Sequence, residues 1–166
     1  MVPSVTAVAM LSLHTSPLAQ PGEGDSGGMN VYVRELAASL AQAGVPVTVY
    51  VRRSSVDQPD RVAVEPLFEV RHVDAGPLDL PKEALPDVID AFADGVRDDL
   101  LARGDVSVLH ANYWLSAVAA HRLKHELELP LVTTFHTLAQ VKSSAGDCEP
   151  DARALAERAV IGCSDA

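Results

Sequence analysis

The sequence predicts a Rossmann-like α/β domain, in which a doubly wound parallel sheet carries helices on both faces. Short apolar runs rich in valine alternate along the chain with segments whose apolar residues recur every three or four positions, as strands and helices do in such folds. Aromatic residues make up only 4% of the 166 residues. The core must therefore be built from aliphatic side chains, which is typical of a parallel sheet covered by helices. The length corresponds to one domain, because domains commonly hold roughly 100–150 residues.

The first third of the chain contains a strand, a helix and a second strand. The apolar run at 5–13 is the first strand. Apolar residues recur at helical spacing over 29–43, and Gly44 follows as a helix stop. The next apolar run, 45–51, contains Pro46. Because proline cannot donate a hydrogen bond to a neighbouring strand, we expect this second strand near the edge of the sheet.

The rest of the chain continues this alternation, which favours parallel strands joined by right-handed crossovers. Strands are expected at 68–73, 106–109 and 131–135, helices at 85–100, 115–127 and 152–158, and the start of one more strand at 160–163. The sequence then ends at 164–166, directly after a predicted strand. We therefore expect it to be a fragment of a longer protein.

Charge and cysteine content exclude several classes of function. The formal net charge is -10, from 13 basic and 23 acidic residues, so a basic surface for nucleic acid or for an anionic membrane is not expected. Cys148 and Cys163 form no disulfide framework, and neither lies in a sequence cluster with metal-ligand spacing. No apolar run approaches the roughly 20 residues that span a bilayer. We expect a cytoplasmic protein without a metal site.

Four loops follow predicted strands and are the candidate site segments, because ligands bind at the carboxyl ends of the strands in an open parallel sheet. These loops comprise residues 14–28, 74–82, 110–113 and 136–137. The first is rich in glycine and leads directly into a helix, so its backbone amides and the helix dipole favour an anion such as phosphate. A flexible turn followed by a helix cap is the alternative interpretation.

The histidines and cations near these loops also allow two interpretations. His110 and His136 are either structural hydrogen-bonding groups or members of a site. Lys82, Lys142 and Arg153 either complete an anion site or are solvated surface charges. The residue pattern therefore predicts an α/β domain with a crevice suited to an anion, and it leaves the chemistry of that crevice open.

Several segments match one known pattern, namely residues 14–22, 24–25, 27–33, 81–86, 113–116, 136–142 and 149–153. With these segments the chain resembles retaining GT-B glycosyltransferases, and it is most similar to the branch that uses D-inositol 3-phosphate in mycothiol biosynthesis. Sucrose synthase and sucrose-phosphate synthase share only the shorter Gly-Gly part. The resemblance extends over nearly the whole chain, and the first loop is its most specific part.

The resemblance implies that residues 1–166 are the N-terminal, acceptor-binding half of a GT-B fold. The C-terminal domain that would bind the nucleotide sugar is expected to be absent, so the fragment alone is expected to have little or no transferase activity. Lys82 and Arg153, with Tyr113 and Thr137, would hold the acceptor's phosphate. The implied acceptor-binding residues are His14, Asp25, Ser26, Gly27, Gly28, Met29, Asn30, Lys82, Tyr113, Thr137 and Arg153, and the implied donor-binding residues are Gln20, Pro21 and Gly28.

His136 is the catalytic residue that the resemblance implies, acting by orientation and electrostatic support rather than as a nucleophile. The implied reaction transfers N-acetylglucosamine from UDP-N-acetylglucosamine to inositol 3-phosphate with retention of configuration. The acceptor hydroxyl attacks on the face that UDP leaves, and phosphate oxygens of the leaving group take its proton. The resemblance implies no metal and no cofactor besides this co-substrate, and it leaves a homodimer open.

Two departures from the family pattern leave the identity of the acceptor open. Residues 117–120 lack the Gly-Trp of the most similar enzymes, and Phe135 differs from their usual residue before the histidine. One alternative is a sucrose-synthase-like transferase with another acceptor. The other is a non-catalytic module that binds a phosphorylated polyol or a nucleotide.

Overall fold

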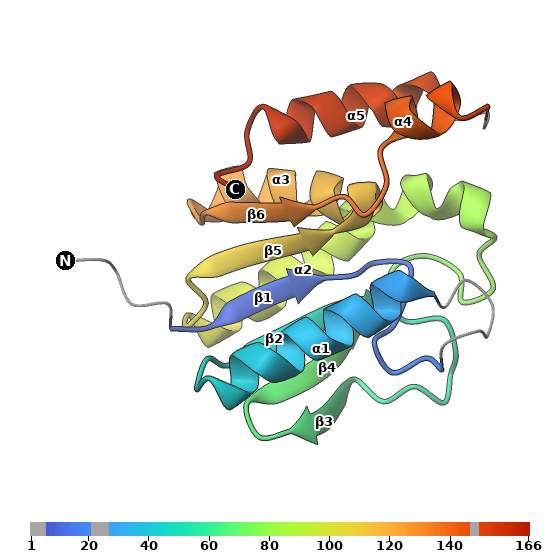
Figure 1. Cartoon of the computed structure of the whole chain (residues 1–166). Coiled ribbons are helices and arrows are strands. Elements are labelled where there is room, and N and C mark those ends of the chain that lie inside the picture. Colours follow the sequence, from blue (N-terminus) through green and yellow to red (C-terminus); the bar gives the residue numbers. More distant parts are fainter. Residues whose placement is uncertain (1–5, 21–26, 147–149) are drawn as a thin grey trace.

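The computed structural model describes residues 6–20, 27–146 and 150–166, and it contains a six-stranded sheet between two layers of helices (Figure 1). The strands are β1 (Val8–Leu11), β2 (Val47–Arg52), β3 (Arg61–Glu65), β4 (Phe68–Val73), β5 (Val108–Asn112) and β6 (Leu131–Thr134). The helices are α1 (Gly28–Gln42), the 3-10 helix η1 (Lys82–Val88), α2 (Ile89–Arg103), α3 (Tyr113–Leu127), α4 (Ala139–Ser144) and α5 (Asp151–Ile161).

The sheet has the strand order β3-β4-β2-β1-β5-β6. Every neighbouring pair is parallel except β3 and β4, which are antiparallel. The chain starts in the middle of the sheet, builds one half outward through β2 and β4, and then crosses back to build β5 and β6. This is the doubly wound arrangement, so the predicted fold class is confirmed, with one antiparallel edge strand added.

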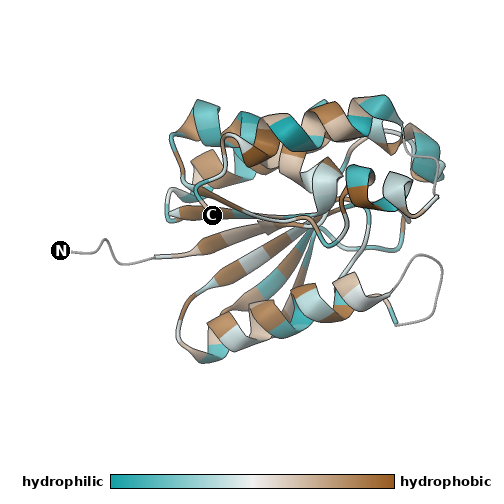
Figure 2. Ribbon diagram, turned by 45° about the horizontal axis from the view of Figure 1, so that its top comes forward, coloured by the Kyte–Doolittle hydropathy of each residue, from teal (hydrophilic) through white to brown (hydrophobic). Residues whose placement is uncertain are grey.

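Aliphatic side chains pack both faces of the sheet. On one face α1 lies alone and places Val33 and Ala37 against Met10 and Val49. On the opposite face α2, α3 and α5 pack together over Leu109 and its neighbours (Figure 2). Burial of apolar surface on both faces explains why the strands of the central sheet are valine-rich rather than alternating apolar with polar.

The prediction that the second strand lies near the sheet edge is wrong. β2 lies between β1 and β4, and all six of its residues are buried. Pro46 immediately precedes the strand, where its carbonyl accepts a hydrogen bond from the Val8 amide at 2.9 Å. Its missing N–H is therefore not needed by the sheet, and the proline is compatible with an internal position.

Two boundaries near the C-terminal half also differ from the prediction. β5 is shifted toward Asn112, so His110 lies inside the strand instead of following it. No strand forms at 160–163, because α5 continues to Ile161 and buries Val160 against the core. The chain pairs with β6 only after this helix, through the Asp165 amide and the Leu131 carbonyl at 2.8 Å.

Three elements were not predicted: β3, η1 and α4. Each is short, and β3 is held as an edge strand by its pairing with β4. Such short segments depend on neighbours in the fold more than on their own periodicity. Among the described residues, none of the helices has the length and apolar character needed to cross a bilayer.

Candidate functional site

Three adjacent strands bring most of the predicted site residues to one edge of the sheet. β1, β5 and β6 are neighbours and run in the same direction, so their carboxyl ends lie side by side (Figure 1). His14 follows β1, Tyr113 follows β5 directly, and His136 and Thr137 follow β6. The topological argument from sequence therefore placed these residues at a common edge, as the fold requires.

A stack of three side chains joins this edge to α5. The rings of His14 and Tyr113 are tilted toward each other, with centroids 4.6 Å apart. The guanidinium carbon of Arg153 lies 4.9 Å from the Tyr113 ring centroid, in cation–π contact on the ring. Tyr113 has a φ of 71°, a left-handed conformation that costs free energy in a bulky residue and is common at functional sites.

Arg153 is anchored in the interior by a carboxylate and by the segment after β6. Its side chain is 3% exposed, and its Nε donates to Glu157 Oε1 at 2.8 Å. Its Nη2 donates to the carbonyl of Thr137 at 3.0 Å and to the Thr137 hydroxyl at 3.2 Å. The other Glu157 oxygen accepts from the Ala139 amide at 2.9 Å. Arg153 therefore positions Thr137, in addition to the phosphate contact expected of it.

A cavity of about 380 Å³ lies beside the stack. His14 and Lys82 both line it, and Lys82 is exposed at the start of η1. Arg52 also lines the cavity, and it donates to the carbonyls of Ala75 at 3.3 Å and of Pro77 at 2.8 Å. The sequence analysis missed Arg52, although its position at the carboxyl end of a strand could have indicated it. Its role is to fix the loop that leads to Lys82.

The first residues of α1 have an exposed backbone at this edge of the sheet. Gly27 is the N-cap residue and makes no side-chain cap, and both Gly27 and Gly28 are exposed. A Cβ atom at either glycine would meet none of the described residues within 4 Å, and neither glycine has a positive φ. Packing and backbone conformation therefore do not demand glycine here. Close approach of a ligand to the helix amides is the remaining physical reason for it.

Asn30 fixes the first loop against α1. It is buried, and its Nδ2 donates to the Ser16 carbonyl at 2.9 Å. Its Oδ1, the Thr15 hydroxyl and Asn112 Nδ2 are buried atoms with no hydrogen-bond partner among the described residues. Unpaired polar atoms cost free energy inside a protein, and here they cluster at the edge where a ligand is expected.

His136 occupies a constrained position at the end of β6. Its φ is 61°, and its ring meets the Tyr32 ring edge-on at 5.0 Å. Its Nε2 lies 3.1 Å from Asn112 Oδ1, which can only accept, so Nε2 carries the proton. Burial lowers the pKa of His136 below its ordinary value. The ring is therefore neutral at pH 7 and available as a hydrogen-bonding group.

His110 lies behind His136, inside β5. Its Nε2 is 3.0 Å from the Thr134 hydroxyl. Burial, with a smaller contribution from repulsion by His136, lowers the pKa of His110 from 6.5 to about 4. Of the two interpretations left open for this residue, the structure favours a structural role, because the side chain is buried within the sheet.

The lowered pKa of His110 makes the free energy of unfolding depend on pH. The native state keeps His110 neutral down to about pH 4, whereas the unfolded chain protonates it near pH 6.5. The unfolded state therefore binds more protons between these values, and stability falls as pH falls through this window. We expect His110 alone to lower the free energy of unfolding by about 2 kcal/mol when the pH falls from 7 to 4.5. Urea unfolding of wild type and of His110→Gln at both pH values measures it; equal losses in the two proteins would contradict the assignment.

Some predicted residues are not at this cluster. Gln20 is exposed in the loop after β1, and Met29 is half-buried at the start of α1 and packs on the core. Pro21, Asp25 and Ser26 lie outside the described residues. The roles assigned to all of these residues stay predictions.

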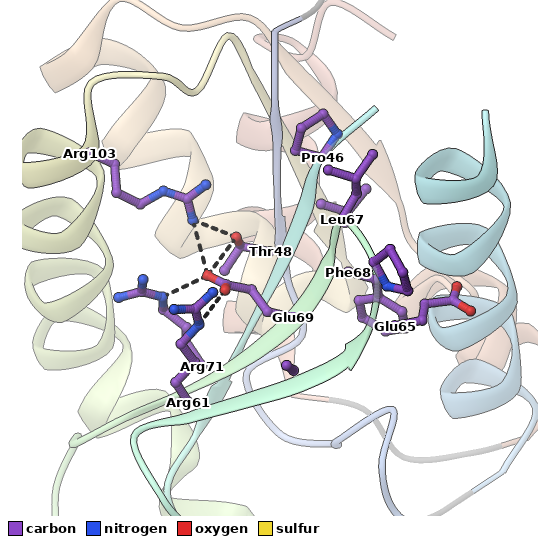
Figure 3. Close-up of a pocket in the computed structure, with 12 residues that line it drawn as sticks. Pro46, Thr48, Arg61, Glu65, Leu67, Phe68, Glu69, Arg71 and Arg103 are labelled. Atoms are coloured by element: carbon purple, nitrogen blue, oxygen red, sulfur yellow. Dashed lines mark hydrogen bonds and ion pairs between the residues drawn. The ribbon is translucent and has the colours of Figure 1, made fainter. Parts of the chain in front are cut away.

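A larger cavity, of about 540 Å³, lies near the amino ends of the strands and away from this cluster. Figure 3 shows Arg61, Arg71 and Arg103 gathered around Glu69 there. Arg71 also pairs with Asp99. Each of these arginines pairs with a carboxylate, and none of the predicted site residues lines this cavity.

Comparison with known proteins identifies the family. A model of the glycosyl transferase 4-like domain matches residues 27–166. The chain belongs to this glycosyltransferase family. The match begins at the N-cap glycine of α1 and continues through every element from α1 to α5.

Several curated relatives of this glycosyltransferase domain share one name. A D-inositol 3-phosphate glycosyltransferase of Xylanimonas cellulosilytica is 46% identical over 166 residues, covering 96% of this chain and 40% of that protein. One of Kineococcus radiotolerans is 45% identical over 169 residues, covering 98% of this chain and 39% of that protein. The chain thus spans about two fifths of the length of these relatives.

Solved structures share the fold. A sucrose-phosphate synthase from Thermosynechococcus elongatus superposes with a TM-score of 0.91 at 29% identity, covering 96% of this chain and 41% of that one. The catalytic domain of starch synthase IV from Arabidopsis thaliana gives a TM-score of 0.56 at 14% identity, covering 78% of this chain and 34% of that one. The glycosyltransferase domain therefore has the fold of one half of a GT-B enzyme.

Proposed function

We propose that this chain is the acceptor-binding domain of a retaining glycosyltransferase that moves N-acetylglucosamine from UDP-N-acetylglucosamine to D-inositol 3-phosphate. The observation that carries the proposal is the convergence of the His14, Tyr113 and Arg153 stack with the cavity that Lys82 lines. The name shared by the curated relatives supports the acceptor. A second domain, outside this chain, would bind most of the nucleotide sugar, and we place the enzyme in the cytoplasm.

The acceptor's phosphate would lie among the groups contributed by Lys82, Tyr113, Thr137 and Arg153. Lys82 supplies a cation at the cavity, and the two hydroxyl groups supply hydrogen-bond donors. Arg153 contributes its positive potential while it holds Thr137 in place. The chain has a net charge of -10, so its overall electrostatic potential is unfavourable for an anion. These few groups must overcome that potential locally, which favours a small anion over a polyanion.

The donor would lie over the start of α1, with its diphosphate close to the amide of Gly28 and with Gln20 and Pro21 at its border. Exposed helix-start amides favour a diphosphate there. Retention follows if the acceptor hydroxyl attacks C1 on the face from which UDP departs. In that step the new C1–O bond forms, the C1–O bond to UDP breaks, and a phosphate oxygen of UDP accepts the hydroxyl proton.

His136 would orient the donor sugar in this reaction. A neutral imidazole whose Nε2 proton is directed to Asn112 keeps the Nδ1 lone pair as a hydrogen-bond acceptor for a sugar hydroxyl. Its left-handed backbone holds the ring at the end of β6, against Tyr32. Positioning of this kind raises rate by keeping the reacting atoms aligned.

Lys82→Ala is expected to weaken binding of D-inositol 3-phosphate by about tenfold, because one charge-assisted contact to phosphate is lost. Calorimetric titration measures the affinity, and the emission of Trp114, whose ring lies 6.4 Å from that of Tyr113, gives a second readout. Lys124→Ala is the matched control, since it removes the same charge from a lysine that pairs with Asp165.

Two outcomes would contradict the proposal. Unchanged affinity in Lys82→Ala would remove Lys82 from the phosphate site. Equal affinity of wild type for inositol 3-phosphate and for inorganic phosphate would indicate a general anion site that does not recognise the inositol ring.

A further inference from the structure

A histidine pair and a cysteine meet at the edge of the sheet opposite the proposed acceptor site. His121 and His125 lie one turn apart on α3 and so share a face of that helix. Cys163 follows α5, which packs on α3. The ligand atoms of the three side chains all lie within 4.8 Å of one another. Sequence spacing could not show this cluster, because Cys163 lies about 40 positions from the two histidines.

The distance between the two histidine nitrogens matches that of a tetrahedral metal site. The Nε2 atoms of His121 and His125 are 3.2 Å apart. Two Zn–N bonds of about 2.05 Å at a tetrahedral angle separate their nitrogens by about 3.3 Å. The two rings meet edge-on, with centroids 4.9 Å apart, and the ligand atoms of both lie within 4.8 Å of the Cys163 sulfur. Cys163 is half-buried and without a disulfide, and its sulfur supplies a third donor.

The donor types select the metal. Two imidazole nitrogens and one thiolate suit Zn²⁺, whereas Mg²⁺ and Ca²⁺ require oxygen ligands. An open cavity of about 430 Å³ borders the site and is lined by His125, Glu128 and Asp165. It supplies a path for the ion and room for a water in the fourth position. Lys124, the nearby cation, is neutralised by its ion pair with Asp165.

We propose that His121, His125 and Cys163 bind one Zn²⁺ ion, with water as the fourth ligand. On binding, the Cys163 thiol releases its proton to solvent, because the thiolate is the ligand. The ion would connect α3 to the segment after α5. That segment is also held by pairing with β6, through the Asp165 amide to Leu131 and the Thr133 amide to Ala166, and by the Lys124–Asp165 ion pair to α3. The site would therefore act as a structural link between α3 and residues 163–166, which follow α5 and lie beside β6 (Figure 1).

Zinc titration against a chromophoric chelator tests the proposal, with Co²⁺ as a spectroscopic probe. We expect one equivalent of Zn²⁺, a rise in the unfolding temperature on zinc addition, and a thiolate-to-cobalt charge-transfer band. Cys163→Ser and His125→Ala should each weaken zinc binding by more than about tenfold, because loss of a ligand costs at least as much as loss of an outer contact. Cys148→Ser is the matched control for the thiol and should leave affinity unchanged.

Each outcome of these experiments either supports or contradicts the zinc site. Because His125 is exposed, its substitution should preserve the fold, which circular dichroism checks. Absence of the charge-transfer band, or unchanged zinc affinity in Cys163→Ser and His125→Ala, would overturn the proposal. Binding of D-inositol 3-phosphate should be the same in His125→Ala and wild type, so the result is independent of the proposed transferase function.

Discussion

Glu157→Ala is expected to lower the free energy of unfolding by about 3–5 kcal/mol, because it breaks a buried ion pair from one side. The side chains of Arg153 and Glu157 are only 3% and 4% exposed. Without the carboxylate, the guanidinium loses this partner in the interior, and the Ala139 amide loses its acceptor. Urea unfolding monitored by circular dichroism measures the loss.

A second Arg–Glu pair in the same chain is the control for this substitution. Arg122 and Glu126 also lie four residues apart on a helix, but their side chains are 30% and 35% exposed. Glu126→Ala should cost less than about 1 kcal/mol, because water replaces the lost contact. Similar losses in the two variants would show that burial of Arg153 and Glu157 has no energetic consequence.

Loss of the Glu157 carboxylate should also disturb the candidate ligand site. Arg153 links the pair to Thr137 through two hydrogen bonds and to Tyr113 through its ring. Glu157→Gln keeps similar hydrogen-bonding atoms without the charge, and it should therefore lose less stability than Glu157→Ala. A folded Glu157→Gln protein also allows binding of inositol 3-phosphate to be measured with Arg153 intact.

Gly28→Val is expected to leave stability nearly unchanged and to reduce kcat/KM by about 100-fold or more in the full-length transferase, since a misplacement of about 1 Å costs this much. A Cβ atom added at Gly28 meets none of the described residues within 4 Å, and the φ of Gly28 is not positive. It would instead occupy the space over the start of α1, where the proposed diphosphate approaches the amides. Steady-state rates with UDP-N-acetylglucosamine and inositol 3-phosphate measure the effect.

Ser39→Val is the control for Gly28→Val. Ser39 is exposed near the opposite end of the same helix, so this variant introduces the same β-branched residue away from the site. It should retain nearly full activity. Full activity in Gly28→Val would mean that no ligand approaches the start of α1, and the proposed donor position would be wrong.

The order of strands and helices could be predicted from sequence because periodicity is a local property. Apolar residues at helical spacing marked α1, α2 and α3, and valine-rich runs marked the central strands. Local chemistry also marked the first loop, whose glycines precede a helix start. The carboxyl ends of parallel strands converge in any such sheet, so the loops that contain His14, Tyr113 and Thr137 could be assigned to one edge.

Side-chain partners could not be predicted in the same way. Arg153 and Glu157 are close in sequence, yet their burial depends on how α5 packs over α3. The left-handed backbone of Tyr113 and of His136 is likewise imposed by surrounding structure, since neither residue prefers it. The unpaired atoms of Asn30 and Asn112 became visible only once the loops were packed.

The sequence by itself determined the fold class, the edge of the sheet at which a ligand would bind, and the glycines at the start of α1. Tertiary structure decided the internal position of β2, the continuation of α5 to Ile161, and the meeting of His121 and His125 with Cys163. The physical reason is that these features depend on interactions of different range along the sequence. Periodicity and turn chemistry act over a few residues, whereas strand order and contacts between residues about 40 positions apart depend on how the whole chain packs.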